Sequence, residues 1–255
     1  STCETWRIIG VFEGKVKLIR NESIGSYSWD NKNISTGAET ANGKNDWTDA
    51  RLMKLLNPGY ESETTGGSLY YNAKSGNCYS GQDNATTTCN FTSEGIKNAE
   101  TRNLISDTTY YLGGWGDSEI YPNQIYEYER GEAVYTGRPT TWQGKIALAY
   151  PSDYSYAADL RKCSKNLLNY DDDACTSNNW MKSIVAPVVP NYGWLLTPFS
   201  GSAYDVWHVD SVGLVNEGGS AFRAVRVAPV LYLSSKLSIK AGTGTNSSPY
   251  QLLTN

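Results

Sequence analysis

Residues 194–233 read WLLTPFSGSAYDVWHVDSVGLVNEGGSAFRAVRVAPVLYL, and this stretch decides the fold class. Short runs of Val, Leu, Trp and Tyr alternate with turns made of Gly, Ser, Asn and Asp, a pattern that is typical of consecutive β-strands. The pattern predicts strands at residues 194–197, 206–209, 214–215, 224–227 and 230–233.

The N-terminal part of the chain adds a hairpin and two helices to these strands. Residues 6–11 and 15–19 are rich in β-branched and aliphatic side chains and flank Glu13-Gly14, a turn signal. Apolar spacing and capping residues predict short helices over residues 46–56 and 93–104.

The middle of the chain contributes more short strands. Strands are expected at residues 109–112 and 146–149, and a hairpin is expected from residues 125–128 and 133–136. The sequence therefore predicts an α+β fold with two short helices and many short strands, in one domain that spans residues 1–255.

The composition excludes several classes of function. The 255 residues carry a formal net charge of −4, which argues against a basic nucleic-acid-binding face. His208 is the only histidine, so a multi-histidine metal site is excluded, and no apolar run is long enough to span a membrane. The 19 Tyr and 8 Trp outnumber the 4 Phe, and Tyr and Trp are typical of hydrated binding surfaces.

Five cysteines predict two disulfides in polar segments. The proposed pairs are Cys78 with Cys89 and Cys163 with Cys175, although four cysteines allow three connectivities and five reduced thiols are the alternative. Cys3 is left without a partner, which we expect in a segment upstream of Ser1. Disulfides favour an extracellular location.

No motif of a known catalytic or cofactor site is present, so we expect neither an enzyme nor a cofactor. His208 is interpreted either as a half-exposed strand residue or as a ligand contact, with a catalytic base as a remote third option. Asp171-Asp172-Asp173 is interpreted as a solvated loop, with a Ca²⁺ site as the alternative. The Tyr-rich segments 110–111, 121–135 and 150–156 are expected either to stack on sugar rings or to cover a sheet edge.

Several short motifs occur in an order that resembles a surface domain of pilin-like proteins from gut Firmicutes. The motifs are Trp6-Arg7-Ile8-Ile9, Lys17-Leu18-Ile19-Arg20, Asn45-Asp46-Trp47, Leu55-Leu56-Asn57, Tyr150-Pro151-Ser152-Asp153-Tyr154, Asn179-Trp180, Trp194-Leu195-Leu196-Thr197-Pro198, Val206-Trp207-His208-Val209, Gly213-Leu214-Val215, Arg226-Val227-Ala228-Pro229, Leu231-Tyr232-Leu233, Gly242-Thr243-Gly244-Thr245 and Pro249-Tyr250.

The resemblance implies a C-type-lectin-like fold related to formylglycine-generating enzymes, with small mixed or antiparallel sheets, paired N- and C-terminal strands and long disulfide-stapled loops. It also implies an upstream anchor or pilin helix. The enzyme's catalytic cysteines have no counterpart here, so that activity is not implied. Where relatives often carry Gly-Val-Arg-Pro, residues 224–229 read AVRVAP, which displaces the proline.

Some members of this class are variable proteins of diversity-generating retroelements, in which adenine-directed mutagenesis rewrites codons near the 3′ end of the gene. The resemblance places the candidate variable, ligand-binding region within residues 190–235, with Trp194, Trp207 and Arg226 as fixed scaffold. The candidate positions are Phe199, Ser200, Ser202, Ala203, Tyr204, Asp205, His208, Asp210, Asn216, Ser220, Ala221, Phe222 and Ala224.

The expected function is therefore binding without catalysis. Tyr204, His208 and Phe222 are the expected aromatic anchors, and Asp205, Asp210 and Asn216 supply polar contacts. The expected ligand is a protein or glycan on another cell or on a host surface, with no nucleic acid and no direct membrane contact by this segment. The alternative is a structural pilus or cell-surface subunit that contacts only its pilus neighbours.

Overall fold

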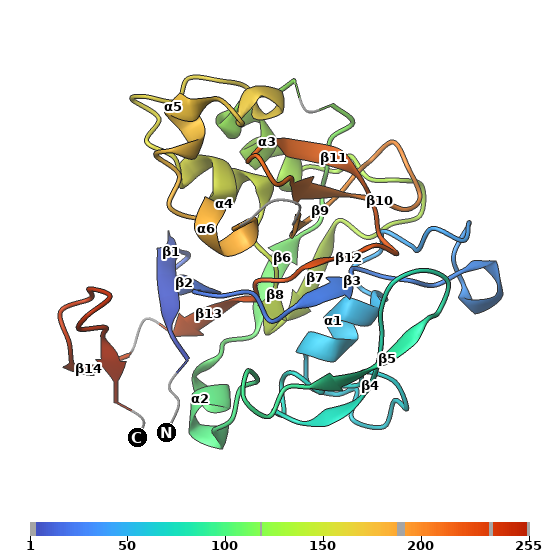
Figure 1. The fold of residues 1–255 in the computed structure, drawn as a ribbon, viewed down its shortest axis with the longest axis horizontal. Helices are drawn as coiled ribbons and strands as arrows, with labels where there is room; N and C mark the ends of the chain where they lie inside the picture. The colour runs from blue at the N-terminus through green and yellow to red at the C-terminus, as the bar shows by residue number, and fades with distance from the viewer. Residues whose placement is uncertain (1–3, 118, 188–191, 235–236, 254–255) are drawn as a thin grey trace.

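The computed structural model describes residues 4–117, 119–187, 192–234 and 237–253. The N-terminal hairpin consists of β1 (Trp6–Phe12) and β2 (Lys15–Arg20), joined by Glu13 and Gly14 with φ angles of 50° and 72°. Strand β2 also pairs with β13 (Val230–Ser234), and β13 pairs with β8 (Ile146–Ala147). The expected pairing of N- and C-terminal strands is thus confirmed, in a sheet of order β1-β2-β13-β8 (Figure 1).

A second sheet has the order β11-β10-β9-β12-β3 and contains four of the five predicted C-terminal strands, whereas the fifth, at residues 230–233, is β13 of the first sheet. Its strands are β9 (Gly193–Pro198), β10 (Asp205–Val209), β11 (Val215–Ser220), β12 (Ala224–Arg226) and β3 (Ser26–Ser28). Strand β12 runs parallel to β9, and the other pairs are antiparallel, so the sheet is mixed.

Three two-stranded sheets complete the β-structure of the described residues. They are β4 (Ser75–Tyr79) with β5 (Thr86–Asn90), β6 (Thr108–Tyr111) with β7 (Thr141–Gly144), and β14 (Ile239–Ala241) with β15 (Gln251–Leu252). The chain around the first disulfide is therefore a hairpin rather than a loop.

The helices are short, and the described residues contain more of them than the two that the sequence predicted. The described residues form α1 (Arg51–Leu56), α2 (Ala99–Leu104), α3 (Pro122–Glu129), α4 (Pro151–Tyr156), α5 (Asp173–Thr176) and α6 (Lys182–Val185), with 3-10 turns at Ile34–Thr36 and Leu167–Asn169. Helices α3 to α6 gather at one end of the molecule (Figure 1). The molecule is thus a mixed α+β protein with short helices, several small sheets and two disulfides.

Residues 125–128, predicted as a strand, belong to helix α3. Pro122 occupies the first helical position, and the Gln124 side chain accepts a hydrogen bond from the Tyr121 N–H. Pro122, Ile125 and Glu129 are buried on one helical face, so tertiary packing outweighs the β-propensity of Ile and Tyr. Helices α1 and α2 also begin later than predicted, at Arg51 and Ala99.

Two hydrophobic cores lie on opposite faces of the β9–β10 pair. Trp194 and Leu196 belong to the core that also holds Trp47, whereas Leu195 and Trp207 belong to the other core. This division follows from the alternation of side chains along a strand. The prediction that Trp47 and Trp194 are core residues is confirmed, since their exposed fractions are 1% and 2%.

Both predicted disulfides are present. Cys78 bonds to Cys89 across the β4–β5 hairpin, and Cys163 bonds to Cys175, which lies in α5. All four cysteines are buried. Cys3 lies outside the described residues.

Replacement of Cys163 and Cys175 together by alanine is expected to lower the free energy of unfolding by about 3 kcal/mol, because the disulfide closes a loop of this length in the unfolded chain. The two cysteines are 12 residues apart, and the segment between them contains only the 3-10 turn at Leu167–Asn169 and the first residues of α5 as regular structure. Urea denaturation of both proteins without reductant measures the difference. Equal midpoints and slopes would contradict the prediction.

Candidate functional site

Most of the predicted binding positions come together where two loops that connect strands of the second sheet lie side by side. The first connection, residues 199–204, joins β9 to β10, and the second, residues 221–223, joins β11 to β12. The Ala221 N–H donates to the Tyr204 carbonyl at 2.9 Å, and the Ser220 hydroxyl lies 3.2 Å from the Asp205 carboxylate. We call residues 199–205 and 220–224 the candidate surface.

The first connection is held through its backbone by the side chain of Asn45. The Asn45 Nδ2 lies 3.0, 2.7 and 2.9 Å from the carbonyl oxygens of Phe199, Ser202 and Asp205. The Asn45 N–H donates to the carbonyl of Ala203. These bonds depend on no side chain of the candidate surface, and the Asn45 residue is 1% exposed.

The Arg138 guanidinium bonds both to the Asn45 side chain and to the first connection, and we call Asn45 and Arg138 together the Asn45 clamp. Its Nε donates to Asn45 Oδ1 at 3.1 Å, and its Nη2 donates to the Ala203 carbonyl at 2.9 Å. Its Nη1 pairs with Glu39 at 2.8 Å, and this guanidinium holds the pKa of the Glu39 carboxyl below its ordinary value. The Asn45 amide is therefore fixed in one orientation.

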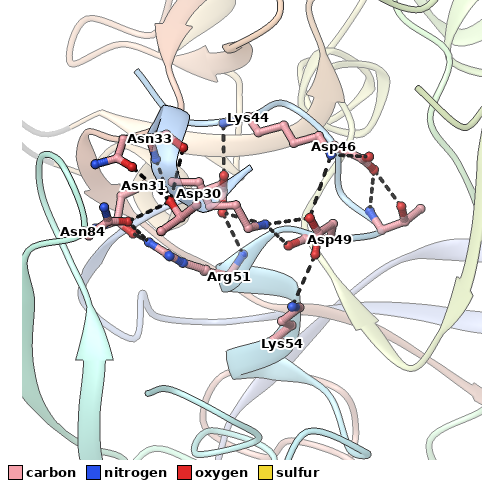
Figure 2. A network of polar contacts seen from close by, with 12 residues as sticks. Asp30, Asn31, Asn33, Lys44, Asp46, Asp49, Arg51, Lys54 and Asn84 are labelled. Carbon is pink, nitrogen blue, oxygen red and sulfur yellow. Dashed lines mark hydrogen bonds and ion pairs between the residues drawn. The ribbon is translucent and has the colours of Figure 1, made fainter. Parts of the chain in front are cut away.

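The chain that carries Asn45 is fastened by a buried polar network (Figure 2). The Asp30 side chain accepts from the backbone N–H groups of Lys44 and Arg51, at 3.0 and 3.2 Å. Lys32 lies 3.5 Å from Asp30 and 2.9 Å from Asp49. Burial raises the pKa of Asp30, whereas these cationic and N–H partners oppose the rise.

The same network reaches the β4–β5 hairpin. The Arg51 guanidinium donates to the side-chain oxygens of Asn31 and Asn84 at 2.9 and 2.6 Å, and it stacks 3.5 Å from the centroid of Tyr79. Asn84 lies in the turn between β4 and β5 with a φ of 60°. The Asn45 segment is thus connected to a hairpin that a disulfide stabilises.

Gly43 lets this segment approach the second connection of the candidate surface. Its φ of 88° favours glycine, and a Cβ there would lie 2.9 Å from the Ala221 Cβ and 2.1 Å from the Asp30 carbonyl oxygen. Close by, the Phe222 N–H donates to the Asn42 carbonyl. The backbone thus holds both connections in place.

Four of the predicted positions do not belong to an exposed binding patch. Ala203 and Ala221 are buried, at 7% and 0% exposed, because the Asn45 clamp and Gly43 pack against them. Asp210 lies at the far end of β10, where its Oδ1 accepts from the N–H groups of Val212, Gly213 and Leu214 at 2.9 Å each. Asn216 lies away from the two connections, and its side chain accepts from the Gly218 N–H. Asp210 therefore stabilises the turn between β10 and β11, and its role as a ligand contact stays a prediction.

His208 is a half-buried strand residue whose ring packs against two aromatic side chains. The ring centroid lies 5.5 Å from Tyr192 and 6.2 Å from Trp194. Its Nδ1 is buried and has no hydrogen-bond partner among the described residues. Burial lowers the pKa of His208 to about 4, so the ring is neutral at pH 7.

The structure also contains a cavity of about 330 Å³ that the predicted site residues do not include. Its walls are aromatic and aliphatic, and its polar groups come from the start of α4. The lining residues are Ile9, Phe12, Tyr126, Ser152, Asp153, Tyr156, Ala157 and Trp180. Four of them fall in the Tyr-rich segments 121–135 and 150–156, and two of these four are tyrosines, whereas Tyr110 is fully buried against Trp142.

Buried charges lie beneath this cavity. Lys17 is 1% exposed and donates to Asp153 Oδ2, which also accepts from the Tyr150 N–H. Glu129 is fully buried, and its two oxygens bond to the N–H and hydroxyl of Ser152. Burial lowers the pKa of Lys17 and raises the pKa of Glu129 to about 8.

The elevated pKa of Glu129 predicts that the protein loses stability as the pH rises from about 4.5 to about 8. Between the ordinary pKa of 4.5 and about 8, the folded chain keeps the Glu129 proton that the unfolded chain releases. The stabilisation is therefore full below pH 4.5 and is lost as the pH rises through about 8. We expect the melting temperature to fall by several degrees across this window and to fall less in Glu129→Gln.

Glu4 provides the control for this prediction. Burial raises its pKa to about 7, so it contributes to the same pH window with the same sign. The Glu4→Gln variant should keep the Glu129 part of the pH dependence, above pH 7. An unchanged pH profile in Glu129→Gln would contradict the assignment.

The acidic run at residues 171–173 contributes a helix cap and an ion pair to the fold. Asp172 caps α5 by accepting from the Ala174 N–H, and it pairs with Lys165 at 3.1 Å. No cluster of three or more His, Cys, Asp or Glu side chains suited to a metal ion occurs in the described parts of the chain. Nor does any helix within those parts have the length and apolar character needed to cross a membrane.

Comparison with known proteins adds no relative to this description. The sequence matches no protein-family model, no curated protein is significantly similar to it, and no solved structure matches its fold.

Proposed function

We propose that this protein is an extracellular, adhesin-like ligand-binding domain displayed on a bacterial surface or pilus, with a C-type-lectin-like fold. Its binding site is the candidate surface, and its ligand is a protein or glycan on another cell or on a host. One observation carries the proposal: the Asn45 amide holds residues 199–205 through backbone carbonyls. A surface held in this way keeps its shape when its side chains change.

The side chains on the candidate surface suit a binding role. Phe199, Tyr204 and Phe222 are half-buried, and the hydrogen bonds that hold them in the fold run through their backbone atoms. Ser200 and Asp205 lie beside them, so that aromatic and adaptable polar groups are mixed. This mixture resembles the composition of antibody-like binding surfaces.

A diversity-generating retroelement would exploit such a surface, and we propose that the gene is diversified in this way. Sequencing the 3′ end of the gene and its downstream flank across a cell population tests this step. Substitutions at codons 199, 200, 204 and 222, beside a near-identical template repeat and a reverse transcriptase gene, are expected. A uniform sequence without a repeat would leave a binding domain of fixed specificity.

The binding proposal predicts that Tyr204→Ala combined with Phe222→Ala abolishes binding and leaves the melting temperature within about 2 °C of the parent value, since mutations at half-exposed positions away from special features change stability little. Binding of the purified domain to surfaces coated with mucin or with bacterial cells is the measurement. The matched control is Tyr250→Ala, which removes a ring that is 46% exposed in the β14–β15 segment. Loss of folding in the double variant would contradict the assignment.

A structural pilus or cell-surface subunit is the second candidate function. Strand β1 is an edge strand, and its Ile8 and Val11 side chains are 53% and 66% exposed. Apolar side chains on an unpaired edge favour contact with a neighbouring subunit. Ordered self-association of the protein, without binding to any coated surface, would favour this candidate over the first.

A further inference from the structure

The cavity between β1, α3, α4 and Trp180 is a second binding site, and we propose that it takes one neutral sugar residue or a disaccharide. None of its lining residues belongs to the candidate surface. The inference therefore stands apart from the proposed function. It assigns a role to the Tyr-rich segments 121–135 and 150–156, for which the sequence left two interpretations open.

The size and the walls of the cavity fit a ring-shaped ligand. Its volume of about 330 Å³ lies at the lower end of the range for small-molecule sites. Phe12, Tyr126, Tyr156 and Trp180 present aromatic rings from separate segments of the chain. The apolar C–H face of a sugar ring packs favourably on such rings, while its hydroxyl groups remain free for hydrogen bonds.

The rings are fixed from outside the cavity. The Arg130 guanidinium lies 3.6 Å from the ring centroid of Tyr126, and the Arg7 guanidinium lies 5.7 Å from that of Trp180. Neither arginine lines the cavity. The cationic groups thus orient the rings, and binding loses less side-chain entropy than it would with mobile rings.

The polar groups of the cavity are suited to hydroxyl groups. The Asp153 side chain uses Oδ2 for its bonds to Lys17 and Tyr150, and its Oδ1 accepts no hydrogen bond from the described residues. The Ser152 hydroxyl bonds to Glu129 with only part of its hydrogen-bonding capacity. A carboxylate oxygen is a strong acceptor for a sugar hydroxyl, and Ser152 stands next to it in the chain.

The charge balance selects a neutral ligand. Asp153 is the only charged residue of the lining, and Lys17 neutralises it from below. Burial raises the pKa of Glu129 to about 8, and its two oxygens bond to Ser152 and to the Arg130 guanidinium, so it adds no unpaired negative charge. The cavity therefore offers no unpaired charge that would attract a cation or an anion.

Titration of the ¹⁵N-labelled protein with single compounds tests the proposal. The neutral probes are glucose, galactose, mannose, N-acetylglucosamine and N-acetylgalactosamine, the cationic probe is choline, and the anionic probe is glucuronate. The readout is the indole N–H resonance of Trp180, which the Trp180→Ala spectrum assigns. At least one neutral sugar is expected to shift this resonance in a saturable manner, with neither charged probe doing so.

Variants then locate the site. Tyr156 is 49% exposed, so Tyr156→Ala should leave the fold intact and weaken sugar binding by about tenfold. Tyr250→Ala, which removes a similarly exposed ring outside the cavity, and the Tyr204→Ala and Phe222→Ala pair should bind the sugar as the parent does. The proposal is overturned if no neutral sugar shifts the resonance, if a charged probe alone does, or if Tyr156→Ala has no effect.

Discussion

Replacement of Asp153 by alanine is expected to lower the free energy of unfolding by about 3–5 kcal/mol, because it strands the ammonium group of Lys17 in the interior. Lys17 is 1% exposed, and Asp153 is its only ion-pair partner among the described residues. The substitution also removes the acceptor of the Tyr150 N–H at the start of α4. Urea denaturation followed by far-ultraviolet circular dichroism measures the loss.

A double variant distinguishes the energetic cost of an unpaired buried charge from the cost of lost packing. In Lys17→Met with Asp153→Leu, both charges are gone and most of the buried volume is retained. This protein is expected to be more stable than Asp153→Ala, since replacing both partners of a buried ion pair costs less than removing one. If Asp153→Ala is as stable as the double variant, Lys17 is not charged in the folded protein.

An exposed ion pair provides the comparison. Arg161 is highly exposed and pairs with Asp159 at 2.9 Å in a short surface turn. Asp159→Ala should leave the denaturation midpoint almost unchanged, since exposed ion pairs contribute little. The contrast between the two aspartates tests burial as the cause of the effect.

The C-terminal strands were predictable because their pattern is local. Residues 194–196 alternate between the two cores, as do Val206 and Trp207, and short turns separate adjacent strands, so the local pattern of apolar and turn residues places β9, β10, β12 and β13. The helices were not predictable in the same way. Helices α4, α5 and α6 have four to six residues, too few for a periodic pattern, and packing against distant strands fixes them.

The candidate surface was predictable in part for the same reason. The order of two adjacent strands at residues 206–209 and 214–215 was predicted, whereas β11 extends to Ser220 and so brings residues 205 and 220 together. The Asn45 clamp was not predictable, because it joins residues separated by 154 to 160 positions. The cavity likewise draws on β1, α3, α4 and Trp180, and only its Tyr-rich composition was visible in the sequence.

Replacement of Asn45 by alanine is expected to lower the free energy of unfolding by about 3–4 kcal/mol and the melting temperature by about 10 °C. The variant leaves three carbonyl groups without their shared donor and removes the acceptor of Arg138 Nε in a region from which water is excluded. Differential scanning calorimetry measures the change. A shift below about 2 °C would show that water replaces the amide without cost.

Asn45→Asp is the matched control, because it keeps the shape of the side chain and exchanges a donor for an acceptor. The Asp carboxylate would strengthen the contact to Arg138, but it would face the carbonyl oxygens of Phe199, Ser202 and Asp205. We expect a loss of stability at least as large as that of Asn45→Ala. Recovery of the parent stability in Asn45→Asp would mean that the Arg138 contact, and not the amide donor, holds the connection.

The proposed function requires that Asn45 and Tyr204 have separate roles, one in stability and the other in binding. If Asn45 holds the surface and Tyr204 contacts the ligand, then Asn45→Ala must lose both stability and binding, and Tyr204→Ala must lose binding alone. This separation is the physical requirement for a surface whose side chains change while its fold persists. A Tyr204→Ala variant that melts as early as Asn45→Ala would show that the two roles are not separate, and residues 199–205 could not then tolerate diversification.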